Sequence, residues 1–282
     1  MIAYFLEALE QYADGVRAYE TYEDSGDWRV SLHFNSPARK KWLAEKLSQL
    51  AEAVSLPVPE INFSEMENKN WVEELAKNFQ PIQCAKFYVY SQFSGPSNEL
   101  IDIKINPGMA FGTGQHETTY LCLEAISFLK DEGFAPENIL DLGCGSGILA
   151  IAAAKIWNQT VTAADNDPIA VQVACENGFE NKVDLECMVS NGFAAFHHYQ
   201  KQQISGRPND IKFDLILANI LMNPLLEMAE DMAEFASNKV ILSGFNTDQT
   251  GRIIDKYTEL GFTAGRIFVK NHWVALLLSK AP

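Results

Sequence analysis

The chain has 282 residues, of which 47% are apolar, so it is long enough for two domains and can bury a sizeable core. Its 37 acidic and 22 basic residues give a formal net charge of -15, which argues against direct nucleic-acid binding because phosphate contacts need clustered Lys and Arg. A surface this acidic either resists aggregation or attracts a basic partner.

The cysteines and the first residues of the chain indicate the cellular compartment. The five cysteines form no Cys-x-x-Cys pair, which argues against a disulfide framework and a zinc site, so we expect small buried thiols and no metal. The start lacks the basic flank and long apolar core of a signal peptide, and no apolar run is long enough to span a bilayer. We therefore expect a cytoplasmic protein that does not contact membranes.

Residues 1–64 are predicted to form a small N-terminal α/β domain. A helix is expected first, over residues 1–13, and two strands follow at 15–23 and 27–34, joined by a turn-like Asp-Ser-Gly. Pro37 then opens a helix, because Trp42, Leu43, Leu47 and Leu50 recur along one face. A short strand is expected after the Pro57-Val-Pro59 break.

Residues 65–98 are predicted to connect this domain to a second one. A short helix is expected at residues 68–79, where Trp71, Leu75 and Phe79 have helical spacing, and Pro81 ends it. Strands are expected at residues 86–90 and 100–105.

From residue 99 to residue 282, strands alternate with helices. This alternation is typical of a Rossmann-like, doubly wound α/β fold with a parallel sheet. The polar run 197–210 is expected as an exposed loop. The expected strands cover residues 139–142, 161–164, 183–189, 213–218 and 239–242, with two more at the C-terminus, and the expected helices include 117–130, 148–157 and 168–177.

The strongest motif is the glycine loop Asp141-Leu-Gly-Cys-Gly-Ser-Gly147, which lies between a predicted strand and a predicted helix. Gly143 and Gly145 allow a tight turn and let a ligand approach the backbone, while the following helix directs free N–H groups at that ligand. The dinucleotide fingerprint needs a glycine where this chain has Ile148. The loop is thus Gly-x-Gly-x-Gly preceded by an acid, which is the methyltransferase pattern; a glycine turn without a ligand is the alternative.

Asp165 ends the next predicted strand, 22 residues after Gly143. A carboxylate at this place and spacing can accept hydrogen bonds from both ribose hydroxyls of a nucleotide-like cofactor. Asp167 is the competing acid, but it precedes Pro168, so we expect it to cap the helix that begins there.

Asn219 ends the predicted strand after the long loop, in Asn219-Ile-Leu221. In amino methyltransferases an Asn at this place, with the next backbone carbonyl, commonly orients the target nitrogen, because an amide oxygen accepts from an amine without protonating it. We therefore expect Asn219 to be catalytic. A cap at the end of the strand is the alternative.

The run from Asn106 to Thr119 contains three glycines and a proline, so we expect a shaped loop close to the cofactor. Thr119 opens the following helix, where its hydroxyl can cap the helix or contact a ligand. Phe111 is expected to cover the cofactor. His116 is a candidate base, although a structural role is the more common one for a loop histidine.

Together these motifs resemble the bacterial ribosomal protein L-eleven (L11) methyltransferases. The run 106–119, the glycine loop extended to Ala152, Asp165-Asn-Asp167 and Ala218-Asn-Ile-Leu221 follow the order and approximate spacing of that family. Ser243-Gly244 and Trp273-Val-Ala-Leu276 also match. The Ala-Phe-Gly-Thr-Gly-x-His-x-Thr-Thr run is the most specific of these signals, because the glycine loop alone would indicate only the superfamily.

The resemblance implies a seven-stranded methyltransferase sheet, a ferredoxin-like N-terminal substrate-recognition domain and a connecting helix. It implies S-adenosylmethionine as cofactor and methylation of lysine side chains and the α-amine of ribosomal protein L11. The family's cofactor contacts carry over to Thr119, Gly143, Asp165 and Asn219. Gly145 in the glycine loop and Phe111 in the run 106–119 are further expected cofactor contacts.

The chain also departs from the family pattern. Asn106 stands where the family usually has Asp, the chain opens on a predicted helix in place of a strand, and the run 197–210 is longer than expected. These departures affect the choice of substrate more than the choice of cofactor. The alternatives are methylation of another protein lysine, methylation of a small molecule, which rarely requires a separate N-terminal domain, and a non-catalytic cofactor-binding module, which would have a degraded glycine loop or lack the Asn.

Overall fold

The computed structural model describes residues 9, 15–20, 28–34, 39–54, 56–64, 79–105, 116–202 and 211–281. The chain divides into two compact units, residues 1–69 and residues 70–282. No helix among the described residues is long and apolar enough to cross a membrane. Of the predicted helices at 1–13 and 68–79 only residues 9 and 79 are described, so the predicted domain and connector boundaries remain predictions.

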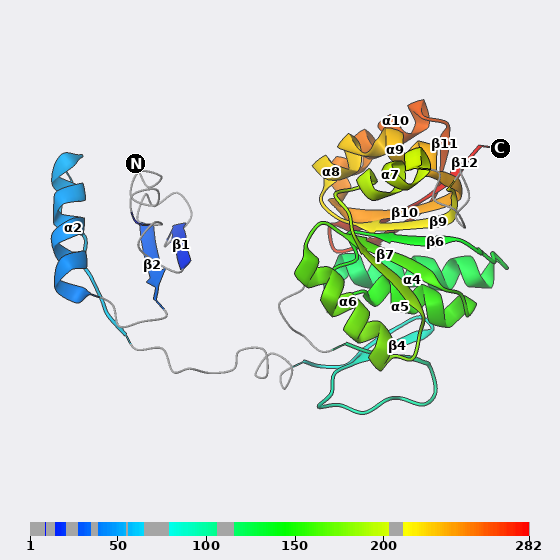
Figure 1. Ribbon diagram of the computed structural model, residues 1–282, viewed down its shortest axis with the longest axis horizontal. Coiled ribbons are helices and arrows are strands. Elements are labelled where there is room, and N and C mark those ends of the chain that lie inside the picture. The colour runs from blue at the N-terminus through cyan, green and yellow to red at the C-terminus, as the bar shows by residue number, and fades with distance from the viewer. Residues whose placement is uncertain are drawn as a thin grey trace. The chain divides into compact units, whose positions relative to one another are not determined.

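The described part of the first unit contains a pair of strands and one long helix (Figure 1). β1 (Gly15–Glu20) and β2 (Trp28–His33) pair antiparallel, which confirms the two predicted strands. α2 (Lys40–Ala53) is amphipathic because leucines recur at intervals of three and four residues. These leucines form a small core with Leu9, and the helix residues buried in it are Leu43, Leu47 and Leu50.

The short strand predicted after Pro59 is wrong, because residues 56–64 contain no helix or strand. Pro57 and Pro59 lack amide hydrogens and so cannot donate to a strand ladder there. Ile61, the apolar residue that suggested a strand, instead packs against the leucine cluster of α2. The ferredoxin-like topology of this unit remains a prediction.

The second unit is built on the predicted doubly wound sheet, with strand order β11-β12-β10-β9-β6-β7-β8. The strands from β10 to β8 in this order are parallel, and β12 runs antiparallel to both β10 and β11 at the edge. The strands are β6 (Ile139–Leu142), β7 (Val161–Asp165), β8 (Leu185–Val189), β9 (Phe213–Asn219), β10 (Ala236–Asn246), β11 (Phe262–Lys270) and β12 (Trp273–Lys280).

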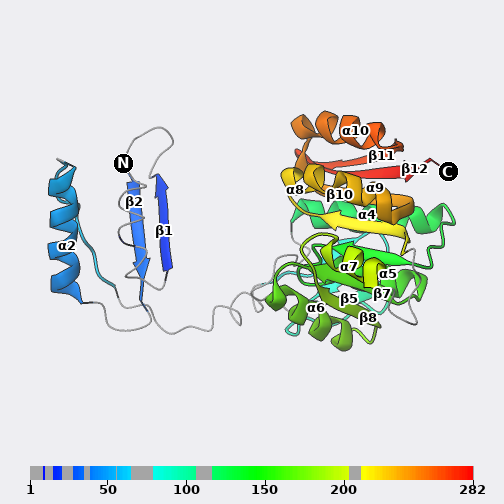
Figure 2. The ribbon, with the colours of Figure 1, turned by 45° about the horizontal axis from the view of Figure 1, so that its top comes forward.

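Helices cover both faces of this sheet, and a separate apolar core fills each face (Figures 1 and 2). The central strand β6 is buried at all four residues, as expected for a strand covered on both sides. On one face lie α4 (Glu117–Asp131), α5 (Ile148–Trp157) and α6 (Pro168–Glu180). On the other lie α7 (Ala194–Gln202), α8 (Met222–Glu227), α9 (Ala229–Phe235) and α10 (Thr250–Glu259), the last preceded by a short 3₁₀ turn at Thr247–Gln249.

A three-stranded sheet extends the core beneath α4 and α5. β3 (Ile82–Cys84) pairs antiparallel with β4 (Phe87–Tyr90), which pairs in parallel with β5 (Ile101–Lys104). Phe87 and Ile103 are fully buried in the core shared with α4 and α5. This sheet belongs to the same compact unit as the seven-stranded sheet.

The loop predicted at residues 197–210 is wrong in its first part, because α7 continues to Gln202. Two aromatic residues at helical spacing hold this helix: Phe193 stacks on Phe235 at 4.9 Å between ring centroids, and Phe196 packs edge-on against Phe213 at 5.4 Å. Tertiary burial of one face therefore overrides the polar composition that suggested a loop.

The expectation of small buried thiols holds for three of the five cysteines. Cys84, Cys122 and Cys144 are buried, and burial raises the pKa of the Cys84 thiol to about 12, so it is unreactive at neutral pH. Cys187 is only half-buried and Cys175 is exposed. All five are free thiols.

Candidate active site

The predicted site residues on the sheet gather where the parallel strands end. Asp165 is the last residue of β7 and Asn219 is the last residue of β9, while the glycine loop follows β6, which lies between these two strands. Parallel strands end at one edge of a sheet, so the three motifs lie at that edge. This is the edge where doubly wound folds bind their ligands.

The glycine loop needs its glycines for conformation and for close contacts. Gly143, Gly145 and Gly147 have φ of +73°, +53° and +79°, values that other residues rarely adopt. A Cβ at Gly143 would lie 2.4 Å from Cγ2 of Ile220, and a Cβ at Gly147 would lie 3.0 Å from Cβ of Ala174. The loop is therefore fitted between α6 and the segment that follows β9.

Asp165 holds this loop in place. One carboxylate oxygen accepts from the backbone N–H of Gly145 at 2.9 Å, and the other accepts from the N–H of Asp167 at 3.0 Å. Each carboxylate oxygen can accept a second hydrogen bond, so Asp165 can also bind a ligand hydroxyl. Asp167 is the N-cap of α6 and accepts from the N–H of Ile169 at 2.9 Å, which confirms its predicted structural role.

Asn219 meets Thr119 although 100 positions separate them in the chain. Nδ2 of Asn219 donates to Oγ1 of Thr119 at 3.3 Å, and Thr119 is fully buried in the first turn of α4. Oδ1 of Asn219 is buried and has no hydrogen-bond partner among the described residues. A buried acceptor without a donor costs roughly 1–3 kcal/mol, so this oxygen is suited to accept a hydrogen bond from a ligand or substrate.

Comparisons with known proteins identify the family. The family model for ribosomal protein L11 methyltransferase (PrmA) matches residues 7–281. Ribosomal protein L11 methyltransferase from Bradyrhizobium diazoefficiens is 35% identical, over 96% of this chain and 90% of its own length. Its counterpart from Wolinella succinogenes is 34% identical, over 93% of this chain and 90% of its own length. The chain belongs to the ribosomal protein L11 methyltransferase family.

Solved structures of methyltransferases have a fold similar to that of this member of the L11 methyltransferase family. The ribosomal protein L11 methylase of Lactobacillus delbrueckii subsp. bulgaricus has a TM-score of 0.58 and 26% identity, covering 72% of this chain and 99% of its own. The Thermus thermophilus 16S rRNA N2 G1207 methyltransferase, solved with AdoMet and guanosine, has a TM-score of 0.51 at 16% identity, over 99% of this chain and 62% of its own. The second likeness shows the fold alone.

As a member of this family, the chain is an S-adenosylmethionine-dependent methyltransferase. The residues present fit that cofactor on two structural observations. The Asp165 carboxylate retains free lone pairs at the end of β7, and the Asn219 oxygen is a buried acceptor without a donor among the described residues. The predicted contact Phe111 lies outside the described residues.

Asp141, the acid before the glycines, is a further buried polar residue next to the site, and the sequence pattern alone does not indicate its contacts. It lies in β6, is 1% exposed, and accepts at 2.9 Å from the N–H of Ala150 in α5. Its Oδ1 has no partner among the described residues. Desolvation raises the pKa of this carboxyl to about 7, opposed by the Ala150 N–H and reinforced by the charge of Asp165.

His116 has a structural role at the start of α4. It is the N-cap of that helix, and its Nδ1 accepts from the backbone N–H of Thr118 at 3.3 Å and lies 2.8 Å from the Thr118 hydroxyl. Its ring also packs edge-on against Trp273, with 4.8 Å between centroids. These contacts favour the structural interpretation of His116 over that of a catalytic base.

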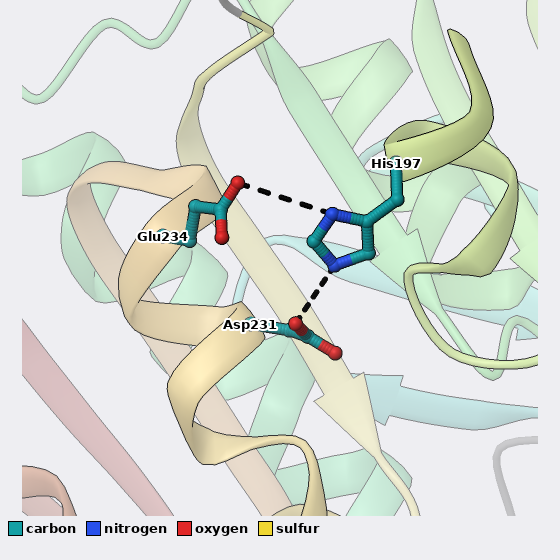
Figure 3. Close-up of side chains that lie close together, drawn as sticks. All are labelled: His197, Asp231 and Glu234. Atoms are coloured by element: carbon teal, nitrogen blue, oxygen red, sulfur yellow. Dashed lines mark hydrogen bonds and ion pairs between the residues drawn. The ribbon is translucent and has the colours of Figure 1, made fainter. Parts of the chain in front are cut away.

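One group of side chains away from the strand ends resembles a metal site (Figure 3). In it, Nε2 of His197 lies 2.8 Å from Asp231 and Nδ1 lies 3.9 Å from Glu234, so the two ring nitrogens face different carboxylates. A metal ion binds through one ring nitrogen, whereas this arrangement uses both sides of the ring. The group is better explained as a polar contact that joins α7 to α9, and the expectation of no metal remains a prediction.

Proposed function

We propose that this chain transfers methyl groups from S-adenosylmethionine to lysine side chains and the α-amine of ribosomal protein L11. The observation that carries the proposal is the buried Oδ1 of Asn219, which lacks a donor among the described residues at the end of β9. An amine brought to this edge of the sheet supplies the missing N–H. Support for the protein substrate comes from relatives that bear this name and cover nearly the whole chain.

In this proposal the cofactor is held by Thr119, Gly143, Gly145, Asp165 and Asn219, with Phe111 covering it. Asp165 serves two purposes, because it accepts the ribose hydroxyls and fixes the Gly145 peptide. Thr119 supports Asn219 by accepting from its Nδ2. That bond determines which end of the amide is anchored and leaves the oxygen to face the substrate.

When bound, S-adenosylmethionine supplies a methyl group that is already activated on a sulfonium. The protein must therefore align a neutral amine with that methyl, because a free lysine has a pKa of about 10.4 and its protonated form has no lone pair. The Asn219 oxygen accepts one N–H of the amine without protonating it, which orients the remaining lone pair. Buried surroundings favour the neutral amine, and the released proton goes to solvent.

The charge of the molecule also supports a basic protein substrate. The net charge of -15 attracts a basic partner such as a ribosomal protein and repels nucleic acid, so we assign no direct nucleic-acid contact. Free thiols are typical of a reducing compartment, and we place the reaction in the cytoplasm.

The role of Asn219 is tested by Asn219→Ala, assayed with ribosomal protein L11 at saturating cofactor. The alanine variant removes the acceptor that aligns the amine, so kcat should fall about a hundredfold or more while KM for the protein changes less than threefold. Calorimetry with the cofactor shows whether its binding is also weakened. A wild-type kcat in Asn219→Ala would overturn the role given to this oxygen.

A further inference from the structure

The strand next to Asn219 contains a β-bulge whose purpose the cofactor site does not explain. β10 pairs with β9 on one side and with β12 on the other, and its register with β12 shifts between Ser243 and Phe245. Gly244 is the extra residue, and its φ of +96° favours glycine. Bulges of this kind are frequent beside active sites, where they redirect the chain.

The bulge touches the segment that follows Asn219. Ser243 pairs with Asn219 at the end of the β9–β10 ladder, and its carbonyl accepts from the N–H of Ile220 at 3.1 Å. A Cβ at Gly244 would lie 2.1 Å from the carbonyl oxygen of Ile220 and 2.6 Å from its carbonyl carbon. Gly244 therefore lies directly against the Ile220 peptide, and no larger residue fits without displacing that peptide.

The other side of Ile220 is equally confined. Its Cγ2 lies 2.4 Å from where a Cβ of Gly143 would be, so the side chain packs on the bare backbone of the glycine loop. The bulge itself is anchored, because the buried Ser243 donates its hydroxyl to the carbonyl of Val274 in β12 at 2.6 Å. The residue after Asn219 is thus held between two glycines on two different elements.

We propose that Gly244 is a positioning residue for methyl transfer, which fixes the Ile220 peptide and through it the direction of the Asn219 amide. This inference rests on the proposed function of Asn219. The β9 strand ends at Asn219, and in the described part of the chain the next residue is confined on two sides, with Gly244 against its peptide and Gly143 against its side chain. Any shift of that peptide turns the amide oxygen away from the amine, and a misplacement of about 1 Å can lower a rate about a hundredfold.

The test compares Gly244→Ala with Gly265→Ala. Gly265 lies in β11 at the far edge of the sheet, and its added Cβ would also meet a backbone carbonyl oxygen, that of Leu277 at 3.1 Å. For Gly244→Ala we expect kcat on ribosomal protein L11 to fall about tenfold or more at saturating protein substrate and saturating cofactor. Because Asn219 is also assigned to the cofactor site, the cofactor affinity of the variant is measured separately by calorimetry. For Gly265→Ala we expect the wild-type kcat, even if its melting temperature falls as much as that of Gly244→Ala.

A second variant keeps the inference testable if Gly244→Ala does not fold. Ile220→Ala preserves the backbone hydrogen bond to Ser243 and removes the side chain beyond Cβ, including the Cγ2 methyl that packs on Gly143, so it should fold and show a smaller loss of kcat. Crystal structures supply a readout independent of activity: we expect a displaced residue-220 peptide in the Gly244→Ala protein, and an Asn219 amide that has lost its hydrogen bond to Thr119 in both variants.

The outcomes separate the two proposals. If the wild-type protein methylates ribosomal protein L11 while Gly244→Ala and Ile220→Ala keep its kcat, the positioning role is overturned and the proposed function stands. A loss of activity that matches only the unfolded fraction also overturns the positioning role. If the wild-type protein is inactive on that substrate, the proposed function fails, and the orientation of the Asn219 amide in the variant crystals still decides the role of Gly244.

Discussion

At the scale of the residue, Asp165 fixes the Gly145 peptide and is assigned the ribose hydroxyls of the cofactor. Substitutions can separate these two roles from the helix capping by Asp167. Asp165→Ala should weaken cofactor binding by roughly 2 kcal/mol, or about thirtyfold, because it removes a charged acceptor and frees the Gly145 peptide. Asp167→Ala is the matched control two residues away. It removes the cap of α6 and should cost about 1 kcal/mol of stability with little effect on cofactor affinity. Calorimetry that shows equal cofactor affinity for Asp165→Ala and the wild type would refute the assignment.

At the scale of the element, the buried Asp141 couples β6 to α5 and makes that junction sensitive to pH. Between pH 3.8, the ordinary pKa of the carboxyl, and about 7, its folded-state value, the folded protein holds a proton that the unfolded chain releases. Rising pH therefore removes stability from this junction, by at most about 1.4 kcal/mol per pH unit.

Asp141→Asn has no proton to lose at this position. The free energy of unfolding of Asp141→Asn minus that of the wild type should therefore increase as pH rises from 4 to 7, measured by denaturant titration without cofactor. A difference that stays constant over this range would show that the carboxyl ionises at its ordinary pKa.

At the scale of the whole molecule, the two compact units should separate in function. A fragment of residues 70–282 keeps Thr119, the glycine loop, Asp165 and Asn219, and it retains the small sheet whose residues fill the core beneath α5. It should bind S-adenosylmethionine within about threefold of the full chain and lose most activity on ribosomal protein L11. Full activity in this fragment would show that the first unit does not recognise the substrate.

Much of the fold and site follows from the sequence because its signals are local. The boundaries of β6 and α5 were predicted to the residue, since a buried apolar strand, a glycine loop and an alanine-rich helix each have a distinct pattern. The capping role of Asp167 follows from the adjacent proline. The order of motifs along the chain was enough to indicate the family.

The features that were not predicted depend on contacts between residues that are far apart in the sequence. The turns of α7 beyond His197 exist because Phe193 and Phe196 reach aromatic partners in α9 and β9. The Thr119–Asn219 hydrogen bond and the bulge at Gly244 require the register of three strands and a helix, which no local pattern specifies. The segment predicted as a strand after Pro59 pairs with no strand in the described part of the chain.

The proposed activity of the chain is methylation of amino groups of ribosomal protein L11. The most direct measurement is mass spectrometry of purified, unmethylated ribosomal protein L11 after incubation with the enzyme and S-adenosylmethionine, with Asn219→Ala as the control. We expect additions in methyl-mass steps at lysine side chains or at the N-terminus, present with the wild-type enzyme and nearly absent with the variant. An unmodified protein, from an enzyme shown by calorimetry to bind the cofactor, would contradict it.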